Sequence, residues 1–383
     1  MKICGIICEY NPLHSGHLYH LDFTKRQGDV VVCVMSGNFT QRGEIACMDK
    51  YVRAKHAIYS GADIVLELPT IFATSSAEHF AYGGIKILNA IGADILSFGS
   101  ECGDINLLTE YAEMLNHPTE EFNLTVKHFL SKGMSYPVAI SNSASQHFAK
   151  PNILNKPNNI LAIEFIRQIK MQNSKMTPIT IEREDNYNEN NLRFNYPSAT
   201  AIRHLFETNQ LDTIGKFIPD YVYEDYKKQI RSDYEQLIYA YLNTLNADSL
   251  KSISRIEGVT EGLENRILAN CAKGNYSLMV EAIKTKRYTL TKLQRIFLAI
   301  LLGKTKNLLT RAKKIRPYTR VLAINKDKLN LLSYLAKCKI SLVPDISKEQ
   351  NCLYELDLKA SNIYASLAQE VGNKDLTMGL QKV

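Results

Sequence analysis

Two histidines near the N-terminus have the spacing most suggestive of chemistry. His14 and His17 follow an apolar run, Ile3 to Cys8, that is typical of a buried strand, in the segment E-Y-N-P-L-H-S-G-H. A helix that opens at H-x-G-H would point backbone N–H groups and a positive dipole end at this turn, and phosphate binds well there. Gly16 would let the backbone come close to a phosphate. The order of strand, turn and histidines predicts a nucleoside triphosphate site in which His14 and His17 are the catalytic pair.

Two other interpretations of the histidines remain open at this point. His20 continues an H-x-x-H-x-x-H spacing that could hold zinc, but zinc sites usually add closely spaced Cys or carboxylate ligands, and Glu9 is the only carboxylate nearby. The histidines could also be ordinary polar residues of a surface loop. We expect no resident metal.

Composition narrows the class of protein. The chain has 383 residues, 45% hydrophobic and 22% charged, which is enough for two domains with packed cores. No apolar run approaches the roughly 20 residues that a membrane span needs, and the first residues turn polar too soon for a signal peptide. Eight cysteines without a C-x-x-C pair are typical of reduced thiols. These features predict a cytoplasmic protein with no membrane contact, and nothing in them implies a protein partner.

Charge is divided unevenly along the chain. Residues 1–150 hold 11 Lys and Arg against 15 Asp and Glu, whereas residues 151–383 hold 35 against 24. Between Lys284 and Lys339 there are 16 basic residues and a single acidic one, with Tyr288, Tyr318 and Tyr334 interspersed. Such a band favours a polyanion partner, with phosphates bound by the cations and unpaired bases stacked on tyrosines. The predicted RNA-binding residues are Lys306, Arg311, Lys313, Lys314, Arg316 and Arg320.

The first two hundred residues alternate short apolar strands with amphipathic helices. We predict strands at 3–8, 29–35, 64–68, 95–98 and 178–181, and helices at 16–26, 49–60, 75–91 and 158–172. This alternation is typical of an α/β fold with a Rossmann-like parallel sheet, in which ligands lie beyond the carboxyl ends of the strands. The turns after the first four strands should therefore border one crevice. The dinucleotide fingerprint G-x-G-x-x-G and the Walker A motif are missing, which disfavours hydride transfer and P-loop chemistry.

The pattern changes beyond residue 205. Helical stretches are predicted at 221–245, 260–273 and 290–302, with mixed character at 320–325 and 340–343. We therefore predict two domains, a catalytic ATP-binding domain at 1–205 and a mostly helical, basic, RNA-binding domain at 206–383.

A second helix start lies just before this change. Pro197 and Ser198 are a typical helix start with Ser198 as N-cap, and Arg203 falls in the second turn. Hydroxyls and an arginine at a helix N-terminus suit a triphosphate, so Ser198, Thr200 and Arg203 are predicted to bind phosphate. The alternative is an ordinary N-cap.

With these residues in view, the chain resembles the H-x-G-H nucleotidyltransferase superfamily and, within it, the bacterial tRNA(Met) cytidine acetate ligase family. The most particular motifs are E-Y-N-P-x-H-x-G-H, S-G-x-F-x-Q-R-G-E and G-A-D-x-V-L-E-L-P, supported by S-F-G-S-E, P-N-N-I-L-A-I-E-F and S-A-T-A-I-R. Two departures from the family pattern are mild: Ser15 stands where relatives often have Asn, and Ala162 replaces a common Gly.

The resemblance implies a reaction in two steps. Family members use ATP, with Mg²⁺ expected beside the triphosphate, to activate acetate as acetyl-adenylate. They then pass the acetyl group to N4 of the wobble cytidine (C34) of elongator tRNA(Met), which gives N4-acetylcytidine, AMP and pyrophosphate. The histidines would stabilise charge on the phosphoryl oxygens. Asn158, rather than Asn159, is implied as the ATP ligand.

Carried over by position, the family's ATP site falls on Ile7, Cys8, Glu9, Tyr10, Asn11, Pro12, Leu13, His14, Ser15, Gly16, His17, Leu18, Tyr19, His20, Gly99, Asn158 and Arg183, with Glu184 as a further member. Two other functions remain as alternatives. One is a small-molecule adenylyltransferase with the same ATP site, and the other is a non-catalytic RNA-binding protein that keeps the fold.

Overall fold

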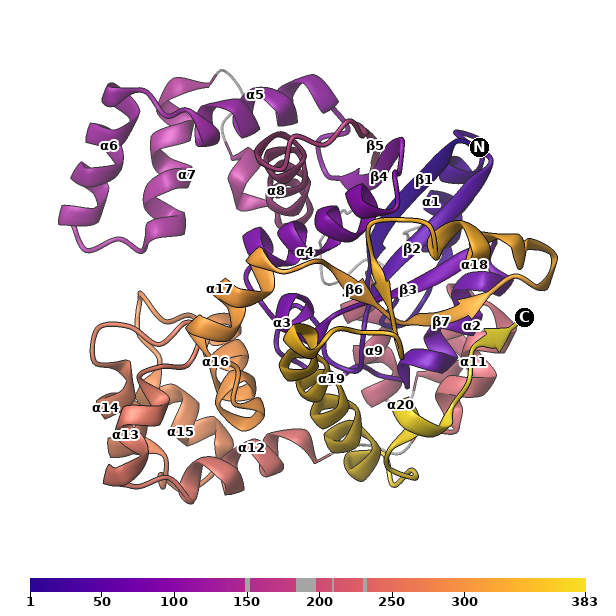
Figure 1. Ribbon diagram of the computed structural model, residues 1–383. Coiled ribbons are helices and arrows are strands. Elements are labelled where there is room, and N and C mark those ends of the chain that lie inside the picture. Colours follow the sequence, from indigo (N-terminus) through magenta and orange to yellow (C-terminus); the bar gives the residue numbers. More distant parts are fainter. Residues whose placement is uncertain (149–151, 184–197, 209, 230–232) are drawn as a thin grey trace.

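The computed structural model describes residues 1–148, 152–183, 198–208, 210–229 and 233–383 (Figure 1). Its main sheet has the strand order β5-β4-β1-β2-β3-β7-β9, in which β5 to β3 run parallel and β7 pairs antiparallel with β3. The predicted Rossmann-like parallel sheet is confirmed. The strands of this sheet are β1 (Ile3–Cys8), β2 (Val30–Ser36), β3 (Ile64–Leu68), β4 (Ile95–Ser100), β5 (Thr177–Glu182), β7 (Val321–Ile324) and β9 (Gln381–Lys382). A second, small sheet pairs β6 (Tyr318–Thr319) with β8 (Ser341–Leu342).

The helices cover both faces of the sheet and extend beyond it. In the N-terminal half they are α1 (Ser15–Lys25), α2 (Lys50–Tyr59), α3 (Thr70–Ala73), α4 (Ala77–Ala90), α5 (Ile105–Asn116), α6 (Glu120–Ser131), α7 (Tyr136–His147) and α8 (Pro157–Met171). They continue as α9 (Ala199–Glu207), α10 (Leu211–Ile214), α11 (Asp220–Lys227), α12 (Tyr234–Asn243), α13 (Leu250–Ile253), α14 (Leu263–Asn270) and α15 (Tyr276–Ile283). The last are α16 (Leu290–Leu302), α17 (Lys306–Lys314), α18 (Asn330–Leu335), α19 (Lys348–Leu367) and α20 (Lys374–Thr377).

The alternation of side chains along β2 divides the core into two layers. Val30, Val32 and Val34 pack with α4 and α8 on one face, whereas Val31 and Cys33 pack with α2 on the other. Successive strand residues point to opposite faces, so a strand that is apolar throughout must be covered on both sides. This double cover leaves the strand ends as the accessible edge of the sheet.

Two features of the helices differ from the prediction. Helices α5 to α7 were not predicted, and α6 and α7 stand apart from the sheet at the upper left of Figure 1. The helix predicted at 221–245 is wrong as one element, because α11 ends at Lys227 and α12 begins at Tyr234. The polar residues Lys227, Lys228 and Gln229 offer no apolar side chain to bury, so nothing holds a continuous helix there.

The C-terminal segment completes the sheet that the N-terminal segment begins. β7 pairs with β3 and β9 pairs with β7, so the end of the chain returns to the first domain (Figure 1). Buried ion pairs hold this return, because Lys50 Nζ lies 2.6 Å from Glu67 and 2.7 Å from Asp375. The predicted division at residue 205 therefore does not follow the limits of the sheet. As a division into folding or functional domains it stays a prediction.

The described residues include no helix that is both long and apolar enough to cross a bilayer. The eight cysteines, all within the described ranges, are free thiols, as predicted.

Candidate active site

A cavity of about 630 Å³ lies at the carboxyl ends of β1 and β4. The strand order reverses between these two strands, since β2 and β3 follow on one side of β1 while β4 and β5 lie on the other. Parallel sheets bind ligands at such a switch point. The wall of the cavity, which we call the first cavity, comes from the turn after β1, the loop after β2, the end of β4, the start of α8, Arg183 and the start of α9.

The turn after β1 is held in place from the loop after β2. Tyr10 has a φ of 45°, in the left-handed region, and so reverses the chain sharply. The Glu9 carboxylate accepts a hydrogen bond from the Gln41 amide at 2.7 Å, and the Asn11 side-chain oxygen accepts one from the Cys47 amide at 2.6 Å. Buried Arg53 donates to the Glu9 carbonyl at 2.6 Å. The turn is therefore fixed before any ligand arrives.

His14 is the N-cap of α1. Its Nδ1 accepts a hydrogen bond from the Gly16 amide at 3.1 Å, which leaves the ring hydrogen of the neutral imidazole on Nε2. The His14 and His17 rings lie against each other, with their centroids 3.8 Å apart, and both line the cavity. Within the described part of the chain, neither Nε2 of His14 nor Nδ1 of His17 has a hydrogen-bond partner, although both atoms are buried. Buried polar atoms normally have partners, so these two fit a polar ligand.

Burial determines the protonation state of the histidines. It lowers the pKa of His14 to about 3 and that of His20 to about 4, and the nearby Arg183 cation lowers both as well. The pKa of His17 lies well below its ordinary value, first through burial and then through His14 and Arg183. His20 is also oriented by Ser97, whose hydroxyl lies 2.9 Å from Nε2. At neutral pH the three rings are therefore uncharged, and each offers an N–H donor rather than a full charge.

Glu101 at the end of β4 holds the N-terminus of α8. Its carboxylate accepts hydrogen bonds from the Asn158 amide at 3.0 Å, the Asn158 side chain at 2.9 Å and the Asn159 amide at 2.6 Å. Asn159 in turn accepts from the Glu101 and Cys102 amides and is buried. Asn158 lines the cavity and Asn159 does not. The two asparagines thus have separate positions, one facing the ligand space and one holding the loop.

Gly99 permits the close approach of Arg183 to the strand end. A Cβ at Gly99 would lie 2.8 Å from Cδ of Arg183, closer than two carbon atoms can approach. The Arg183 side chain therefore lies across β4, with its charge near the histidines. Gly99 and Arg183 are far apart in the sequence, but this packing places both in the wall of one cavity.

Most of the predicted ATP-site residues border this cavity. Those in its wall are Ile7, Cys8, Glu9, Tyr10, Asn11, His14, His17, His20, Gly99, Asn158 and Arg183, together with Ser198, Thr200 and Arg203 of the predicted phosphate site. Not in the wall are Pro12, Leu13, Ser15, Gly16, Leu18 and Tyr19. Leu13 belongs to the core, whereas Tyr19 is half exposed. Glu184 lies outside the described residues.

The helix start at Ser198 has the predicted geometry. The Ser198 hydroxyl accepts from the Ala201 amide at 3.2 Å, as an N-cap does. Arg203 donates to the Asn11 carbonyl at 2.8 Å, and so ties α9 to the turn after β1. Thr200 is exposed at the rim of the cavity.

One predicted border of the crevice is wrong. The turn after β3, residues 67–69, does not line the cavity. Glu67 is buried, pairs with Lys50 and lies 3.6 Å from Arg320, because β7 and the C-terminal helices cover that edge of the sheet. A carboxylate at a strand end can thus form a buried ion pair in the core instead of binding a ligand.

Sequence reasoning named no site residue in the loop after β2. Thr40, Gln41, Arg42 and Glu44 all line the cavity, as do Glu101 and Lys156. The signal was available, since the motif S-G-x-F-x-Q-R-G-E follows a strand whose carboxyl end faces the same edge.

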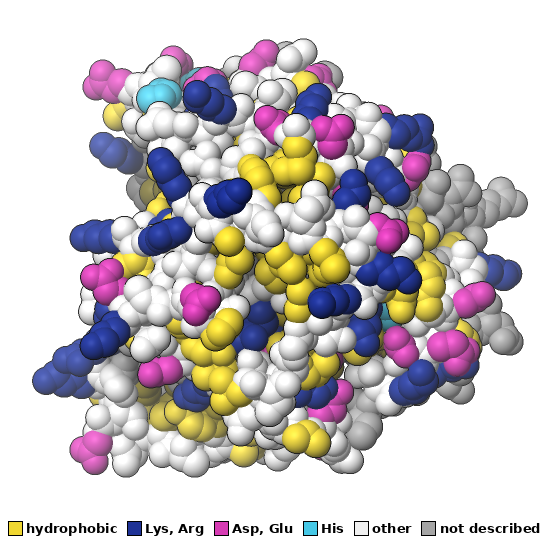
Figure 2. Space-filling model, turned by 45° about the vertical axis from the view of Figure 1, so that its right-hand side comes forward, with side chains coloured by type: hydrophobic (Ala, Val, Ile, Leu, Met, Phe, Trp, Pro, Cys, Tyr) yellow, Lys and Arg dark blue, Asp and Glu magenta, His cyan; other side chains and the backbone are white. Residues whose placement is uncertain are grey.

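The predicted RNA-binding residues divide into two groups. Lys306, Arg311, Lys314 and Arg316 are exposed, and Lys313 is half-buried on α17. The prediction that Arg320 binds RNA does not fit the structure, because its guanidinium is largely buried between Glu67 and the Tyr354 hydroxyl. Tyr288 and Tyr318 are also buried, so neither can stack on a base. On the face shown in Figure 2, basic side chains are interspersed with acidic and apolar ones.

The fold and the paired histidines at its switch point define a nucleotidyl transferase of the H-x-G-H type. The sequence profile described as HIGH Nucleotidyl Transferase matches residues 1–378. The tRNA(Met) cytidine acetate ligase of Clostridium perfringens is 38% identical over 97% of this chain and 96% of its own, and that of Caldicellulosiruptor saccharolyticus is 41% identical over 95% and 94%.

A solved structure agrees with the sequence relatives. The crystal structure of Thermotoga maritima TmcAL bound with alpha-thio ATP superimposes with a TM-score of 0.89 at 29% identity, over 100% of both chains. The chain therefore belongs to the tRNA(Met) cytidine acetate ligase family of the HIGH nucleotidyl transferases.

Proposed function

We propose that this protein acetylates elongator tRNA(Met) at N4 of its wobble cytidine, with acetate and ATP as co-substrates. The observation that carries the proposal is the pair of buried ring nitrogens of His14 and His17 at the switch point, which have no partner among the described residues. The chain is also related along nearly its full length to ligases of that name. The ATP-analogue complex of the Thermotoga maritima relative supports ATP as the nucleotide.

In the first step, an acetate oxygen attacks the α-phosphorus of ATP, a new P–O bond forms and pyrophosphate leaves. Negative charge grows on the phosphoryl oxygens, and we propose that the Nε2–H of His14, which has no partner among the described residues, stabilises it. Since the rings are neutral, they act as hydrogen-bond donors, and their burial in the wall makes such bonds strong. Arg183 and Arg203 supply the positive charge for the polyphosphate.

Mg²⁺ is proposed to enter with the triphosphate. Such sites use one or two carboxylates together with phosphate oxygens and waters. Glu9 lines the cavity next to the histidine turn, and only one of its carboxylate oxygens accepts from the Gln41 amide, so the other would hold the ion. Both carboxylate oxygens of Glu101 accept from amides of α8. The ion would neutralise charge on the phosphates.

In the second step, the exocyclic amine of cytidine attacks the acetyl carbon, and AMP leaves. The amine is a weak nucleophile, so orientation in the site must supply much of the rate. An anticodon-loop base is unpaired and can enter a protein cavity without the opening of a duplex. We propose that Lys306, Arg311, Lys313, Lys314 and Arg316 hold the RNA backbone.

The test is a reconstituted reaction with radiolabelled acetate, ATP and an unmodified elongator tRNA(Met) transcript. Label is expected in N4-acetylcytidine after digestion of the RNA, and not in a matched transcript with uridine at the wobble position. Acetate-dependent exchange of pyrophosphate into ATP without any label on RNA would contradict the proposal and favour a small-molecule acceptor.

A further inference from the structure

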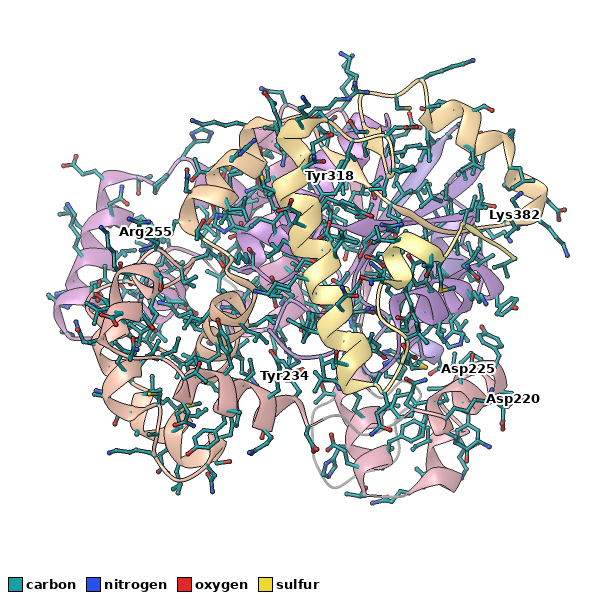
Figure 3. All side chains as sticks on the ribbon, turned by 60° about the horizontal axis from the view of Figure 1, so that its bottom comes forward. Asp220, Asp225, Tyr234, Arg255, Tyr318 and Lys382 are labelled. Carbon is teal, nitrogen blue, oxygen red and sulfur yellow. The ribbon has the colours of Figure 1, made fainter. Side chains whose placement is uncertain are left out.

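A second cavity, of about 880 Å³, adjoins the first one. The two cavities share Glu44 and Arg203 in their walls. The second cavity continues from there along residues 44–47, the end of α9, the start of α12 and the start of α15, and reaches α19. Tyr234, at the first residue of α12, is labelled in Figure 3. A group bound in this second cavity would therefore reach the ATP cavity past Glu44 and Arg203.

The wall of the second cavity is aromatic. Phe206 and Tyr226 contact each other with ring centroids 3.6 Å apart, and Tyr276 supplies a third partly exposed ring. Tyr234 and Tyr364 also line the cavity, but their side chains are buried. Aromatic walls of this kind bind planar groups by stacking, and proteins use them for unpaired bases. The amide side chains of Gln229, Gln236 and Gln294 add hydrogen-bond donors and acceptors.

The charges of the second cavity favour a base over a phosphate. Its acidic side chains are Glu44, Glu207, Asp233 and Glu235, and its basic ones are Arg203 and Lys227. An acidic wall repels phosphate, whereas Glu and Asp carboxylates accept hydrogen bonds from the exocyclic amine of cytosine. The RNA backbone has better partners in the exposed cations of α17.

The loop after β2 places Glu44 between the two cavities. Its backbone carbonyl accepts from the Thr40 amide at 2.9 Å, and the preceding Gly43 carbonyl accepts from the Tyr234 hydroxyl at 2.9 Å. Gly43 has a φ of 79°, and a Cβ there would lie 2.6 Å from the Arg295 backbone nitrogen. A carboxylate oxygen of Glu44 lies 3.5 Å from Arg203, and the side chain keeps a third of its surface exposed. The carboxylate is thus fixed in position yet accessible.

Tyr276 lies close to the same carboxylate. Burial raises the pKa of Tyr276, and the carboxylates of Glu235 and Glu44 raise it further. The hydroxyl therefore stays protonated, and the ring remains an uncharged stacking surface beside Glu44.

We propose that the second cavity receives the base of the acceptor cytidine, with Glu44 as the acceptor of a hydrogen from its exocyclic amine. The inference rests on the proposed function and adds a site and a residue role to it. During transfer, the bond between the amine nitrogen and the acetyl carbon forms, and the bond from that carbon to the phosphate oxygen breaks. One amine proton passes to the Glu44 carboxylate, and AMP leaves with its phosphate.

The experiment measures the two steps separately in Glu44→Gln. Acetate-dependent exchange of pyrophosphate into ATP reports the first step without RNA, and single-turnover transfer from preformed acetyl-adenylate to the tRNA(Met) transcript reports the second. Loss of a general base costs on the order of 10²-fold or more in the step that it serves. Transfer is expected to fall by that factor, with a much smaller fall in exchange. Glu281→Gln, an exposed substitution on α15 outside both cavities, is the matched control.

A second pair of variants tests the stacking surface. Tyr276→Phe keeps the ring and Tyr276→Ala removes it, so only the alanine variant is expected to raise KM for the transcript, by roughly tenfold. If Glu44→Gln slows both steps equally or leaves transfer unchanged, or if the two Tyr276 variants behave alike, the inference is wrong. A parent protein that transfers no acetyl to RNA would instead contradict the proposed function itself.

Discussion

The first cavity and the basic segment at residues 284–339 differ in how they use polar side chains. In the cavity, the turn after β1 and the end of β4 present His14, His17 and Gly99 directly to the ligand space. In the basic segment, Lys304 is buried beneath α3 while Arg311 is exposed on α17. A strand end in a parallel sheet has one accessible direction, whereas a helix distributes its residues around a cylinder. The type of a residue therefore predicts its contact with a ligand better at a strand end than along a helix.

The largest expected effect concerns a buried cation of the basic segment. Lys304 donates to the Ser75 hydroxyl at 2.7 Å and lies 3.0 Å from Glu257. Lys304→Ala would remove the cation from the largely buried Glu257 carboxylate and leave it only the Ser75 hydroxyl and His79, which costs up to about 3–5 kcal/mol. Denaturant unfolding should show this loss, whereas Arg311→Ala should change the free energy of unfolding by less than about 0.5 kcal/mol. Similar unfolding midpoints for the two variants would contradict the distinction between buried and exposed cations.

The next largest effect concerns the histidine turn. His14→Asn keeps a side-chain acceptor for the Gly16 amide but removes the Nε2 donor, which has no partner among the described residues. Acetate-dependent exchange of pyrophosphate into ATP should fall by about 10² to 10³, as for other lost transition-state donors. His204→Asn, an exposed histidine of α9, is the control. Exchange at the parent rate in His14→Asn would show that the charge is stabilised elsewhere.

The same comparison shows what the sequence can predict. The strands and the H-x-G-H turn were predictable because a buried strand is apolar throughout and its carboxyl end in a parallel sheet faces the ligand. The separate positions of Asn158 and Asn159 were not visible from composition, and the preference for Asn158 came from the family resemblance. The cavity places Asn158 in its wall, but its contact with ATP stays a prediction.

The basic segment was harder to interpret because its partners come from distant parts of the chain. Arg320 lies 3.6 Å from Glu67 on β3, and the hydroxyl of Tyr318, which Figure 3 labels, lies 2.6 Å from Asp357 on α19. A count of charges within one segment does not include ion-pair partners that lie far away in the sequence. Helices α5 to α7 escaped prediction for a similar reason, since they carry few buried residues and pack mainly on one another and on α8.

A pH titration of stability should show the burial of the histidines. The folded pKa values of His14 and His20 lie at about 3 and 4, below the unfolded value of about 6.5. As the pH falls, the unfolded chain therefore binds protons before the folded one does. The contribution of the neutral rings to stability is fully present above pH 6.5 and is lost as the pH drops toward the folded pKa values. The free energy of unfolding should fall by up to about 1.4 kcal/mol per pH unit for each ring. Denaturant unfolding at pH 7 and pH 5 checks this, and His14→Asn should show a shallower fall. An identical pH dependence in parent and variant would mean that the ring is solvated.

The smallest expected effect concerns the exposed cations of α17. Lys314→Ala should weaken binding of the tRNA(Met) transcript only a few-fold, because one phosphate contact among several is lost, and should lower the slope of log Kd against log salt by about one. Lys382→Ala makes the same change of charge on β9, at the C-terminal end of the chain, which lies well away from α17 in Figure 1, and should leave the slope unchanged. If both variants lower the slope equally, the RNA surface extends over the sheet edge as well. If neither does, the tRNA is held elsewhere, and the exposed cations of α17 serve only to keep the surface hydrated.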